Sequence, residues 1–275
     1  MLLSPRSVTE ACAMLREHAG EALPIAGGTA LEVLRRLGLL GSPPLVDLSR
    51  VAELRGIERR GDEVRVGACV TLREVVRSPE IAAGLSLLAQ TCSRVGNPRV
   101  RNQATLGGNL AYADHRIDAP AALLALDARV RLRSADGTRE VPLRGFFRGL
   151  ERTELAPDEL LTEVLVPVPP PGAVGCFRRM PGLTENDWPG ASVAVVRRPG
   201  AGGDTLQVGL SALAPAPRHL EVQVGGLGLA QAQELVDEAA AGLIDPVGDL
   251  GGSPAYKRRL GRVALREAVE AVWSR

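Results

Sequence analysis

The sequence predicts an α+β protein, and three observations along the chain support this fold class. Short apolar runs alternate with capped helical segments over residues 7–48, which is typical of an α/β unit. From about residue 57, apolar and polar residues alternate with the period of two that marks half-buried strands. Beyond a proline-rich break at 167–172, a hairpin of strands and a long terminal helix are expected.

The first part of the chain is predicted to contain two helix–strand pairs. Ser7 and Glu10 form a capping box, and Gly20 stops the helix that follows it. A second helix opens directly after the pair Gly27-Gly28. In order, the expected elements are a helix at 7–19, a strand at 22–26, a helix that ends at Gly38 and a strand at 45–48.

The middle part combines strand alternation with further helices. A second capping box, Thr71 with Glu74, marks a helix start, and Asp136-Gly137 is a hairpin turn between two alternating runs. The expected elements are strands at 64–70, 129–133, 141–143 and 161–168, with helices at 79–94 and 119–127.

The last part is predicted to be a hairpin followed by a helix. Strands at 192–196 and 206–213 flank a glycine-rich turn at 200–203. Ser253 is a suitable N-cap and Pro254 suits the first helical turn, so a long helix is expected to continue toward the C-terminus.

Composition and charge argue against several classes of function. The 33 basic and 32 acidic residues give a net charge of +1, which does not favour nucleic acid or a membrane surface as a partner. No apolar run approaches the ~18 residues of a membrane helix and no signal peptide is visible, so a cytoplasmic protein is expected. The four cysteines are scattered without a C-x-x-C pair, which disfavours zinc and iron–sulfur sites and fits a reducing compartment.

Two loops carry the residues that suggest a binding chemistry. Each has a Gly-Gly pair after an apolar run, where bare backbone N–H groups can point outward and bind an anion. Together they can hold the two phosphates of a diphosphate, with added hydrogen bonds from Thr29, Thr105 and Asn109. The first loop consists of Pro24, Ile25, Ala26, Gly27, Gly28, Thr29, Ala30 and Leu31, and the second contains Thr105, Leu106, Gly107, Gly108 and Asn109.

The Gly-Gly pairs taken alone are also compatible with ordinary turns, which are the commoner context for such short motifs. Neither loop matches G-x-G-x-x-G or G-x-x-x-x-G-K-[ST], so a Rossmann site and a P-loop are both unsupported. Phosphate binding by these loops is therefore a hypothesis that depends on further motifs.

Such motifs occur in a consistent order along the chain. The first loop is similar to an A-G-G-[TH] segment and the second to an R-N-x-A-T-[LI]-G-G-[ND] segment, both of one family. Other similar stretches are LVDLSRVAELRGI at 45–57, GACVTLREVVRSPEI at 67–81, ALLALDARVRL at 122–132, TELAPDELLTEVLVP at 153–167 and GSPAYKRRL at 252–260. Over nearly its whole length, the chain thus resembles the FAD-binding (medium) subunits of the molybdenum hydroxylase family, of the xanthine dehydrogenase and carbon monoxide dehydrogenase flavoprotein type.

The resemblance implies a site residue by residue. Both loops would face the diphosphate of a non-covalent FAD, and Asp118, nine residues after Asn109, would contact the cofactor. Leu161 in the P-D-E-L-L segment would lie beside the flavin, and Arg178, which follows Phe177, would approach it. Judged without the resemblance, Asp118 is an N-cap candidate, Leu161 a core residue of a strand and Arg178 a surface arginine.

Two positions depart from the family pattern. His115 stands where the family often has proline, and it is expected to be either a solvent-exposed loop histidine or a hydrogen-bonding contact of FAD. Val95 stands near the position where xanthine-type members place an aromatic residue that packs on the flavin. Val95 remains a candidate cofactor contact, but ring stacking at this position is not available.

The resemblance also implies a domain organisation. The FAD-binding domain would cover 1–170, with a small βαβ unit at 1–57 and a mixed sheet with helices at 58–170. Residues 173–275 would form a C-terminal domain with a three-stranded antiparallel sheet and packed helices. FAD is expected between the two subdomains, because domain interfaces are common ligand sites.

The implied function is electron transfer within a larger redox enzyme. A molybdenum-cofactor large subunit would oxidise the substrate, and a 2Fe–2S small subunit would pass electrons to FAD and on to an external acceptor. A stand-alone FAD-dependent oxidoreductase is one alternative, although no Ser, Tyr or Glu constellation for proton chemistry is evident. A cofactor-free assembly module is another, and the two intact Gly-Gly loops disfavour it.

Overall fold

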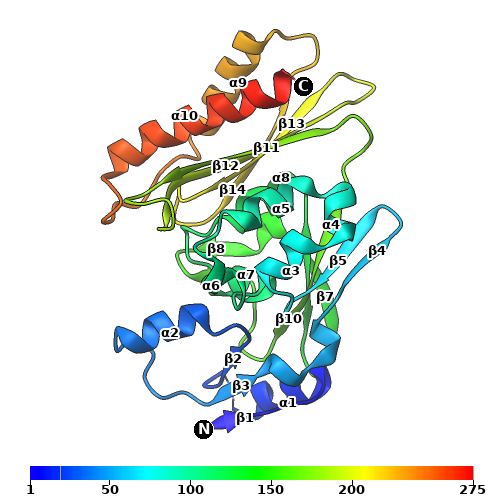
Figure 1. The fold of residues 1–275 in the computed structure, drawn as a ribbon, viewed down its shortest axis with the longest axis vertical. Coiled ribbons are helices and arrows are strands. Elements are labelled where there is room, and N and C mark those ends of the chain that lie inside the picture. The colour runs from blue at the N-terminus through cyan, green and yellow to red at the C-terminus, as the bar shows by residue number, and fades with distance from the viewer. Residues whose placement is uncertain (19, 275) are drawn as a thin grey trace.

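The computed structural model describes residues 1–18 and 20–274, which form three parts stacked along the long axis (Figure 1). The N-terminal unit lies at one end, an antiparallel sheet with helices lies in the middle, and the C-terminal sheet with two helices lies at the other end. The fold class is α+β, as the sequence predicted. None of the helices in these two ranges is both long and apolar enough to cross a membrane.

The N-terminal unit is a parallel sheet with two helices. Its elements are β1 (Leu2–Leu3), α1 (Val8–Glu17), β2 (Leu23–Ile25), α2 (Thr29–Arg36) and β3 (Leu45–Asp47). The strand order is β1-β3-β2, and both outer strands run parallel to β3. Ser7 caps α1 by accepting a hydrogen bond from the backbone N–H of Glu10, as the sequence predicted. The two-residue strand β1 was not expected, because it is too short to show an alternation pattern.

The sheet of the middle part is antiparallel rather than mixed, which corrects the expectation for this region. Its strands are β4 (Ile57–Arg60), β5 (Glu63–Gly67), β6 (Arg129–Arg133), β7 (Thr138–Pro142) and β10 (Leu160–Pro167), in the order β4-β5-β10-β6-β7. The hairpins β4–β5 and β6–β7 fix two antiparallel pairs, and β10 runs between them antiparallel to both neighbours. A small hairpin, β8 (Phe147–Gly149) and β9 (Arg152–Thr153), precedes β10.

Six short α-helices belong to the described middle part. They are α3 (Leu72–Arg77), α4 (Pro79–Gly84), α5 (Ser86–Ser93), α6 (Pro98–Arg101), α7 (Leu106–Tyr112) and α8 (Ala119–Ala125). The single helix expected at 79–94 is thus split into α4 and α5, because Leu85 adopts φ −129° and ψ 40° between them. Both helices bury apolar side chains, so the periodicity of the sequence did not reveal the break. Short 3₁₀ turns occupy Leu48–Arg50, Ala52–Leu54 and Leu143–Gly145.

The C-terminal sheet has four antiparallel strands, one more than expected. Its elements are β11 (Val174–Pro181), β12 (Pro189–Arg198), β13 (Thr205–Ser211) and β14 (Arg218–Gln223), followed by α9 (Leu229–Ala241) and α10 (Pro254–Trp273). Alternation predicted only β12 and β13. In β11 the neighbours Cys176 and Phe177 are both buried, because α10 packs on one side of this strand and α5 on the other. Strands covered on both faces lose the alternation of apolar and polar residues.

Helix α8 joins the middle part to the C-terminal sheet. All of its residues are buried. Gly209 on β13 permits the close packing, because a Cβ there would lie 2.0 Å from the carbonyl oxygen of Ala121. Phe177 and Ala194 of the C-terminal sheet share one core cluster with Leu123 of α8, so these two parts are held together by a common core.

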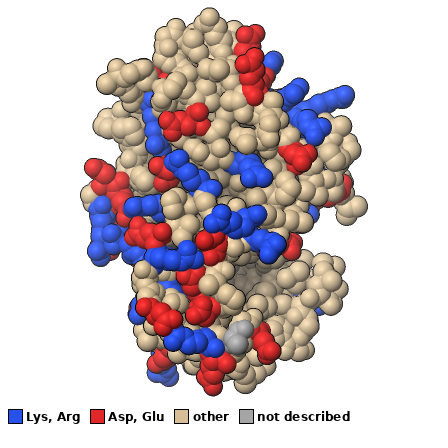
Figure 2. Space-filling view, turned by 180° about the vertical axis from the view of Figure 1, so that it is seen from behind, with Lys and Arg blue, Asp and Glu red and all other residues tan. Residues whose placement is uncertain are grey.

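The face of the molecule seen in Figure 2 carries interleaved charges and a hollow. Cross-strand ion pairs on the five-stranded sheet join Arg129 to Glu63, and Arg131 to both Glu140 and Glu163. On the face seen in Figure 2, basic and acidic side chains alternate across the middle of the molecule. Below them the surface is hollowed where the N-terminal unit meets the middle part, and the candidate site lies at this junction.

Candidate functional site

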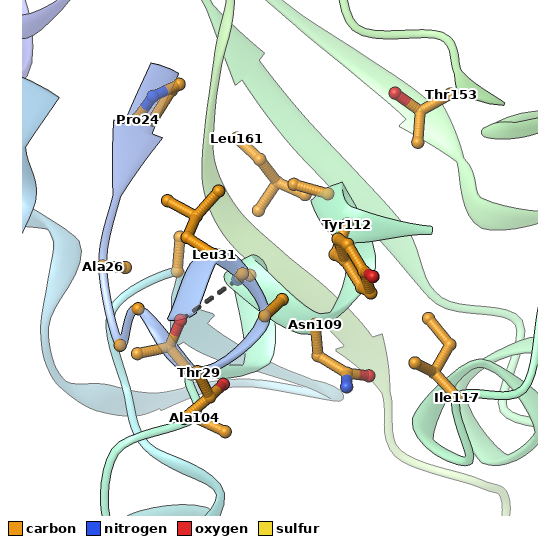
Figure 3. Close-up of a pocket in the computed structure, with 18 of the residues that line it drawn as sticks. Pro24, Ala26, Thr29, Leu31, Ala104, Asn109, Tyr112, Ile117, Thr153 and Leu161 are labelled. Carbon is orange, nitrogen blue, oxygen red and sulfur yellow. Dashed lines mark hydrogen bonds between the residues drawn. The ribbon is translucent and has the colours of Figure 1, made fainter. Parts of the chain in front are cut away.

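A cavity of about 730 Å³ lies between the N-terminal unit and the middle part. Cavities that hold small molecules and cofactors measure about 300–1,000 Å³, so this one suits a large ligand. Its walls come from the first loop with α2, the second loop with α7, from β10, and from the C-terminal segment 186–189. Figure 3 shows Pro24, Leu31, Asn109 and Leu161 arranged around this space.

The two Gly-Gly loops meet backbone to backbone at the cavity wall. A Cβ on Gly27 would lie 1.9 Å from the carbonyl oxygen of Gln103 and 3.1 Å from the Cα of Ala104. No side chain fits between the loops, so Gly27 is required by space. Two segments that are far apart in the sequence therefore form one continuous surface.

The first loop presents free backbone N–H groups. Gly28, the N-cap of α2, has a φ of 68°, in the left-handed region that favours glycine. The N–H of Glu32 donates to the carbonyl of Gly28 at 2.9 Å and starts the helical pattern. The N–H groups of Thr29, Ala30 and Leu31 have no acceptor within the described residues, as expected for a first helical turn. These donors and the positive end of the helix dipole favour an anion.

In the second loop, by contrast, N–H groups donate hydrogen bonds to other groups of the protein. Those of Leu106 and Gly107 donate to backbone carbonyls of the segment 68–70, at 2.9 and 3.0 Å. The N–H of Gly108 donates at 3.1 Å to the hydroxyl of Thr105, which is the N-cap of α7. The expectation that both loops offer bare amides is therefore corrected for Leu106, Gly107 and Gly108, whose N–H groups are bonded within the protein.

Asn109 is the group that the second loop offers to the cavity. Its side chain lines the cavity (Figure 3), and its amide oxygen Oδ1 is buried without a hydrogen-bond partner in the described part of the chain. A buried acceptor without a donor costs about 1–3 kcal/mol, so a ligand that donates to Oδ1 would remove this cost. Gly107 permits close packing of this loop, because a Cβ there would lie 2.5 Å from the Cβ of Ala68.

Most residues that the sequence placed at the site line the cavity. They are Pro24, Ala26, Gly27, Gly28, Thr29, Ala30, Leu31, Val95, Thr105, Gly107, Gly108, Asn109, Asp118 and Leu161. Leu161 on β10 is 4% exposed, so it is a core residue of the strand and a wall of the cavity at once. The structure thus brings these residues together, and their contact with a cofactor stays a prediction.

Three of the expected site residues do not line the cavity. Ile25 lies beneath the first loop, and Leu106 is fully buried in the core of the middle part. Arg178 points away, with its Nε 3.6 Å from a carboxylate oxygen of Glu267 on α10. Its neighbour Arg179 lines the cavity, because successive side chains of a strand point to opposite faces. The structure therefore favours Arg179, and not Arg178, as the basic residue that faces the cavity. The two differ by one position along the strand.

Asp118 lies in the cavity wall and is bound to the C-terminal sheet. Its carboxylate accepts hydrogen bonds from the hydroxyl of Ser192 and, at 3.1 Å, from Nε of Arg179. Asp118 occupies the N-cap position of α8, as the sequence suggested, but its side chain makes no hydrogen bond to the start of that helix. Burial raises the pKa of the Asp118 carboxyl, and the Arg179 guanidinium opposes this shift. Arg179 also donates to backbone carbonyls within 185–187, so this pair fixes the cavity rim.

His115 is buried rather than exposed, which corrects one expectation for it. Only 7% of its surface is accessible, and its Nδ1 lies 3.6 Å from a carboxylate oxygen of Asp114. Its Nε2 has no partner among the described residues. Burial lowers the pKa of the His115 imidazole, although Asp114 acts in the opposite direction. His115 is not part of the cavity lining, so the structure gives no support for its contact with FAD.

Sequence reasoning missed several side chains of the wall. They include Tyr112, Ile117, Thr153 and Trp188. Tyr112 follows Asn109 by three residues on α7, so helical spacing could have placed both on one face. Trp188 lies beyond β11, and the guanidinium of Arg116 sits 4.7 Å from its ring centroid. No local pattern signals Thr153 or Trp188, because distant parts of the chain bring them to the cavity.

The fold and the cavity define a flavoprotein of the FAD-binding type. Residues 1–169 match the family described as "FAD binding domain in molybdopterin dehydrogenase". This span covers the N-terminal unit and the middle part, and so it contains both loops and α7. The chain belongs to this family, and FAD is its cofactor.

Full-length relatives agree with this assignment. The chain is 33% identical to the carbon monoxide dehydrogenase medium chain of Hydrogenophaga pseudoflava, over 99% of this chain and 96% of the relative. It is 32% identical to the nicotine 6-hydroxylase medium subunit of Paenarthrobacter nicotinovorans, over 97% and 94%. The solved carbon monoxide dehydrogenase of Hydrogenophaga pseudoflava matches with a TM-score of 0.93 and 31% identity, over 99% of this chain and 96% of that one. The resemblance to FAD-binding medium subunits of molybdenum hydroxylases is thereby confirmed.

Proposed function

We propose that this chain is the electron-transfer subunit of a molybdenum-dependent hydroxylase or dehydrogenase complex. A large subunit with the molybdenum cofactor would oxidise the substrate, and a 2Fe–2S small subunit would deliver the electrons to this chain. From here they would leave to an external acceptor. The support is similarity over nearly the whole chain to medium chains and subunits of such enzymes. Four buried cysteine thiols that form no disulfide in the described part of the chain fit a reducing compartment such as the cytoplasm.

The observation that carries the proposal is a set of unpaired donors and one unpaired acceptor on two loops that meet. The N–H groups of Thr29, Ala30 and Leu31 suit the oxygens of a diphosphate. The buried Oδ1 of Asn109 suits a donor, such as a sugar hydroxyl of the same dinucleotide. The residues present therefore fit FAD, both in hydrogen-bonding capacity and in the volume of the cavity.

FAD supplies the redox chemistry, because a flavin can exchange electrons in pairs or singly. The chain binds, orients and shields it. The apolar side chains of Val95, Ile117 and Leu161 exclude water from their part of the cavity. Asp118, held by Arg179, fixes the wall where the middle part meets the C-terminal sheet. No side chain of this chain is assigned a role in substrate chemistry, which would take place on the large subunit.

Purification through a tag on this chain tests the proposal. We expect a yellow complex that releases FAD on denaturation and contains two further subunits, together with molybdenum and iron by metal analysis. A yellow chain that purifies alone and oxidises a small substrate would instead indicate a stand-alone flavin oxidoreductase. A colourless, FAD-free chain that still binds two partner subunits would indicate an assembly module.

A further inference from the structure

Two aromatic side chains line the cavity, and they differ in what already covers their rings. These are Tyr112 and Trp188, out of seven aromatic residues in the chain. The guanidinium of Arg116 occupies one face of the Trp188 ring, 4.7 Å from its centroid. The ring of Tyr112 has no aromatic or cationic partner within the described residues, and it is directed into the cavity (Figure 3). Tyr112 therefore presents the open aromatic surface of this site.

The position of Tyr112 along the cavity points to one half of the dinucleotide. It lies three residues after Asn109 on α7, about 4.5 Å further along the helix axis and away from the loops. The lining near it combines the apolar side chains of Ile117 and Leu161 with the hydroxyl of Thr153 (Figure 3). An isoalloxazine ring has broad apolar faces and an edge of carbonyl and ring-nitrogen groups, so it needs this mixture.

The opposite end of the cavity has a different character. Near α2 its lining carries the apolar side chains of Leu23, Pro24, Leu31 and Leu34, with the hydroxyl of Thr29 at the start of the helix. The unpaired N–H groups belong to Thr29, Ala30 and Leu31, in the first turn of α2, which lines the cavity. With the diphosphate held there, the polar end remains for the flavin half and the apolar end for the adenosine half.

We propose that the ring of Tyr112 packs against the isoalloxazine ring of bound FAD. This inference rests on the proposed function and assigns a cofactor contact that sequence analysis did not identify. Offset packing of aromatic rings adds attraction beyond the burial of their surface, so Tyr112 strengthens binding of the flavin half in particular.

The protonation state of Tyr112 suits this contact. Burial raises the pKa of its phenol, and the carboxylates of Asp114 and Glu151 act in the same direction. The phenol is therefore neutral at physiological pH, which keeps the ring uncharged against the flavin. Its O–H also remains available as a hydrogen-bond donor.

The test compares Tyr112→Leu and Tyr112→Phe in the purified complex after removal and re-addition of FAD. Tyr112→Leu should weaken FAD binding about tenfold and shift the visible absorption band of the flavin. Tyr112→Phe keeps the ring and should stay within about twofold of the wild type. Tyr256→Leu is the matched control, because Tyr256 on α10 is 49% exposed and lies outside the cavity lining. Tyr112→Met, which is closer to tyrosine in length, replaces Tyr112→Leu if the latter complex does not assemble.

Binding of FMN and of ADP, which represent the two halves of FAD, shows which half Tyr112 contacts. FMN should bind the Tyr112→Leu complex more weakly than the wild type, whereas ADP should bind both equally. An unchanged FAD affinity and absorption band in Tyr112→Leu, or a loss for ADP instead of FMN, would overturn the assignment. A wild-type complex that binds no flavin would overturn the proposed function itself, and the two failures are therefore distinguishable.

Discussion

The two Gly-Gly loops have nearly the same sequence signature and perform different tasks. In the first loop, the N–H groups of Thr29, Ala30 and Leu31 are left without protein acceptors at the start of α2. In the second loop, the N–H groups of Leu106 and Gly107 are bonded to the segment that follows β5, and the loop offers a side chain instead. A repeated dipeptide is therefore not evidence of a repeated function.

The difference has a geometric cause. Gly28 takes a left-handed conformation and turns the first loop abruptly from β2 into α2, which exposes the first helical turn. Gly107 has no such backbone requirement and is needed because the segment around Ala68 approaches too closely for a side chain. We therefore expect substitutions that displace the first loop to lower FAD affinity, and packing substitutions in the second to affect mainly stability.

The largest effect on FAD retention is expected for Gly27→Ala. The added methyl group would lie 1.9 Å from the carbonyl oxygen of Gln103, so the two loops must separate and the first loop must move. We expect the affinity for FAD to fall by roughly a hundredfold or more, which corresponds to about 3 kcal/mol. Equilibrium binding of FAD to the deflavinated complex measures this. Gly137→Ala is the control, because no atom lies within 4 Å of a Cβ at that position.

Gly107→Ala should destabilise the fold. A Cβ there would lie 2.5 Å from the Cβ of Ala68 and 2.8 Å from its carbonyl oxygen. Overpacking of this kind costs about 1–3 kcal/mol, and contact with backbone places Gly107 at the upper end. Urea unfolding of the variant, compared with Gly137→Ala, measures the loss. A variant that is as stable as the wild type but has lost FAD would contradict the division of labour between the loops.

Local signals in the sequence predicted local structure well. The capping residues Ser7, Thr71 and Ser253 are N-caps in the structure, and each hydroxyl accepts from the backbone N–H three residues later. These features depend on neighbours within one helical turn, so the sequence contains them in full. The same holds for the cavity residues in the two contiguous loops, which line the site together.

Features that depend on contacts between distant segments could not be predicted from local sequence signals. Arg178 and Arg179 look equivalent in the sequence, and only the pairing of β11 with β12 decides which one faces the cavity. The bonded state of the amides in the second loop depends on carbonyls of the segment 68–70, more than thirty residues earlier. Trp188 reaches the rim only because the C-terminal sheet packs on α8.

Asn109→Ala tests whether the side chain that the second loop contributes to the cavity serves FAD binding or the stability of the fold. The substitution removes the buried oxygen that lacks a donor, so the cofactor-free protein should lose no stability. The affinity for FAD should fall about tenfold, because the hydrogen bond to Oδ1 is lost in the complex. Calorimetric titration with FAD and thermal unfolding without FAD measure the two quantities. Loss of stability without a change in affinity would show that Asn109 serves the fold and not the cofactor.

The smallest expected effect is a pH dependence of the folding stability that leaves FAD affinity unchanged. His115, which follows α7, is buried among Asp114, Arg116, Asp249 and Lys257, and burial lowers its pKa below the ordinary value of 6.5. The native state therefore binds a proton less readily than the unfolded chain. The stability that the neutral imidazole contributes is complete above about pH 6.5 and is lost as the pH falls through the lowered native value.

Urea unfolding between pH 7.5 and 5 should accordingly show a decline in the free energy of unfolding, with a slope of at most ~1.4 kcal/mol per pH unit from this group. His115→Gln cannot take up the proton and should flatten that part of the decline. The affinity of the wild type for FAD should not follow the same titration, because the backbone donors of the first loop carry no titratable proton. A parallel loss of FAD affinity and stability in this window would mean that the two loops are energetically coupled and that the division between them is incomplete.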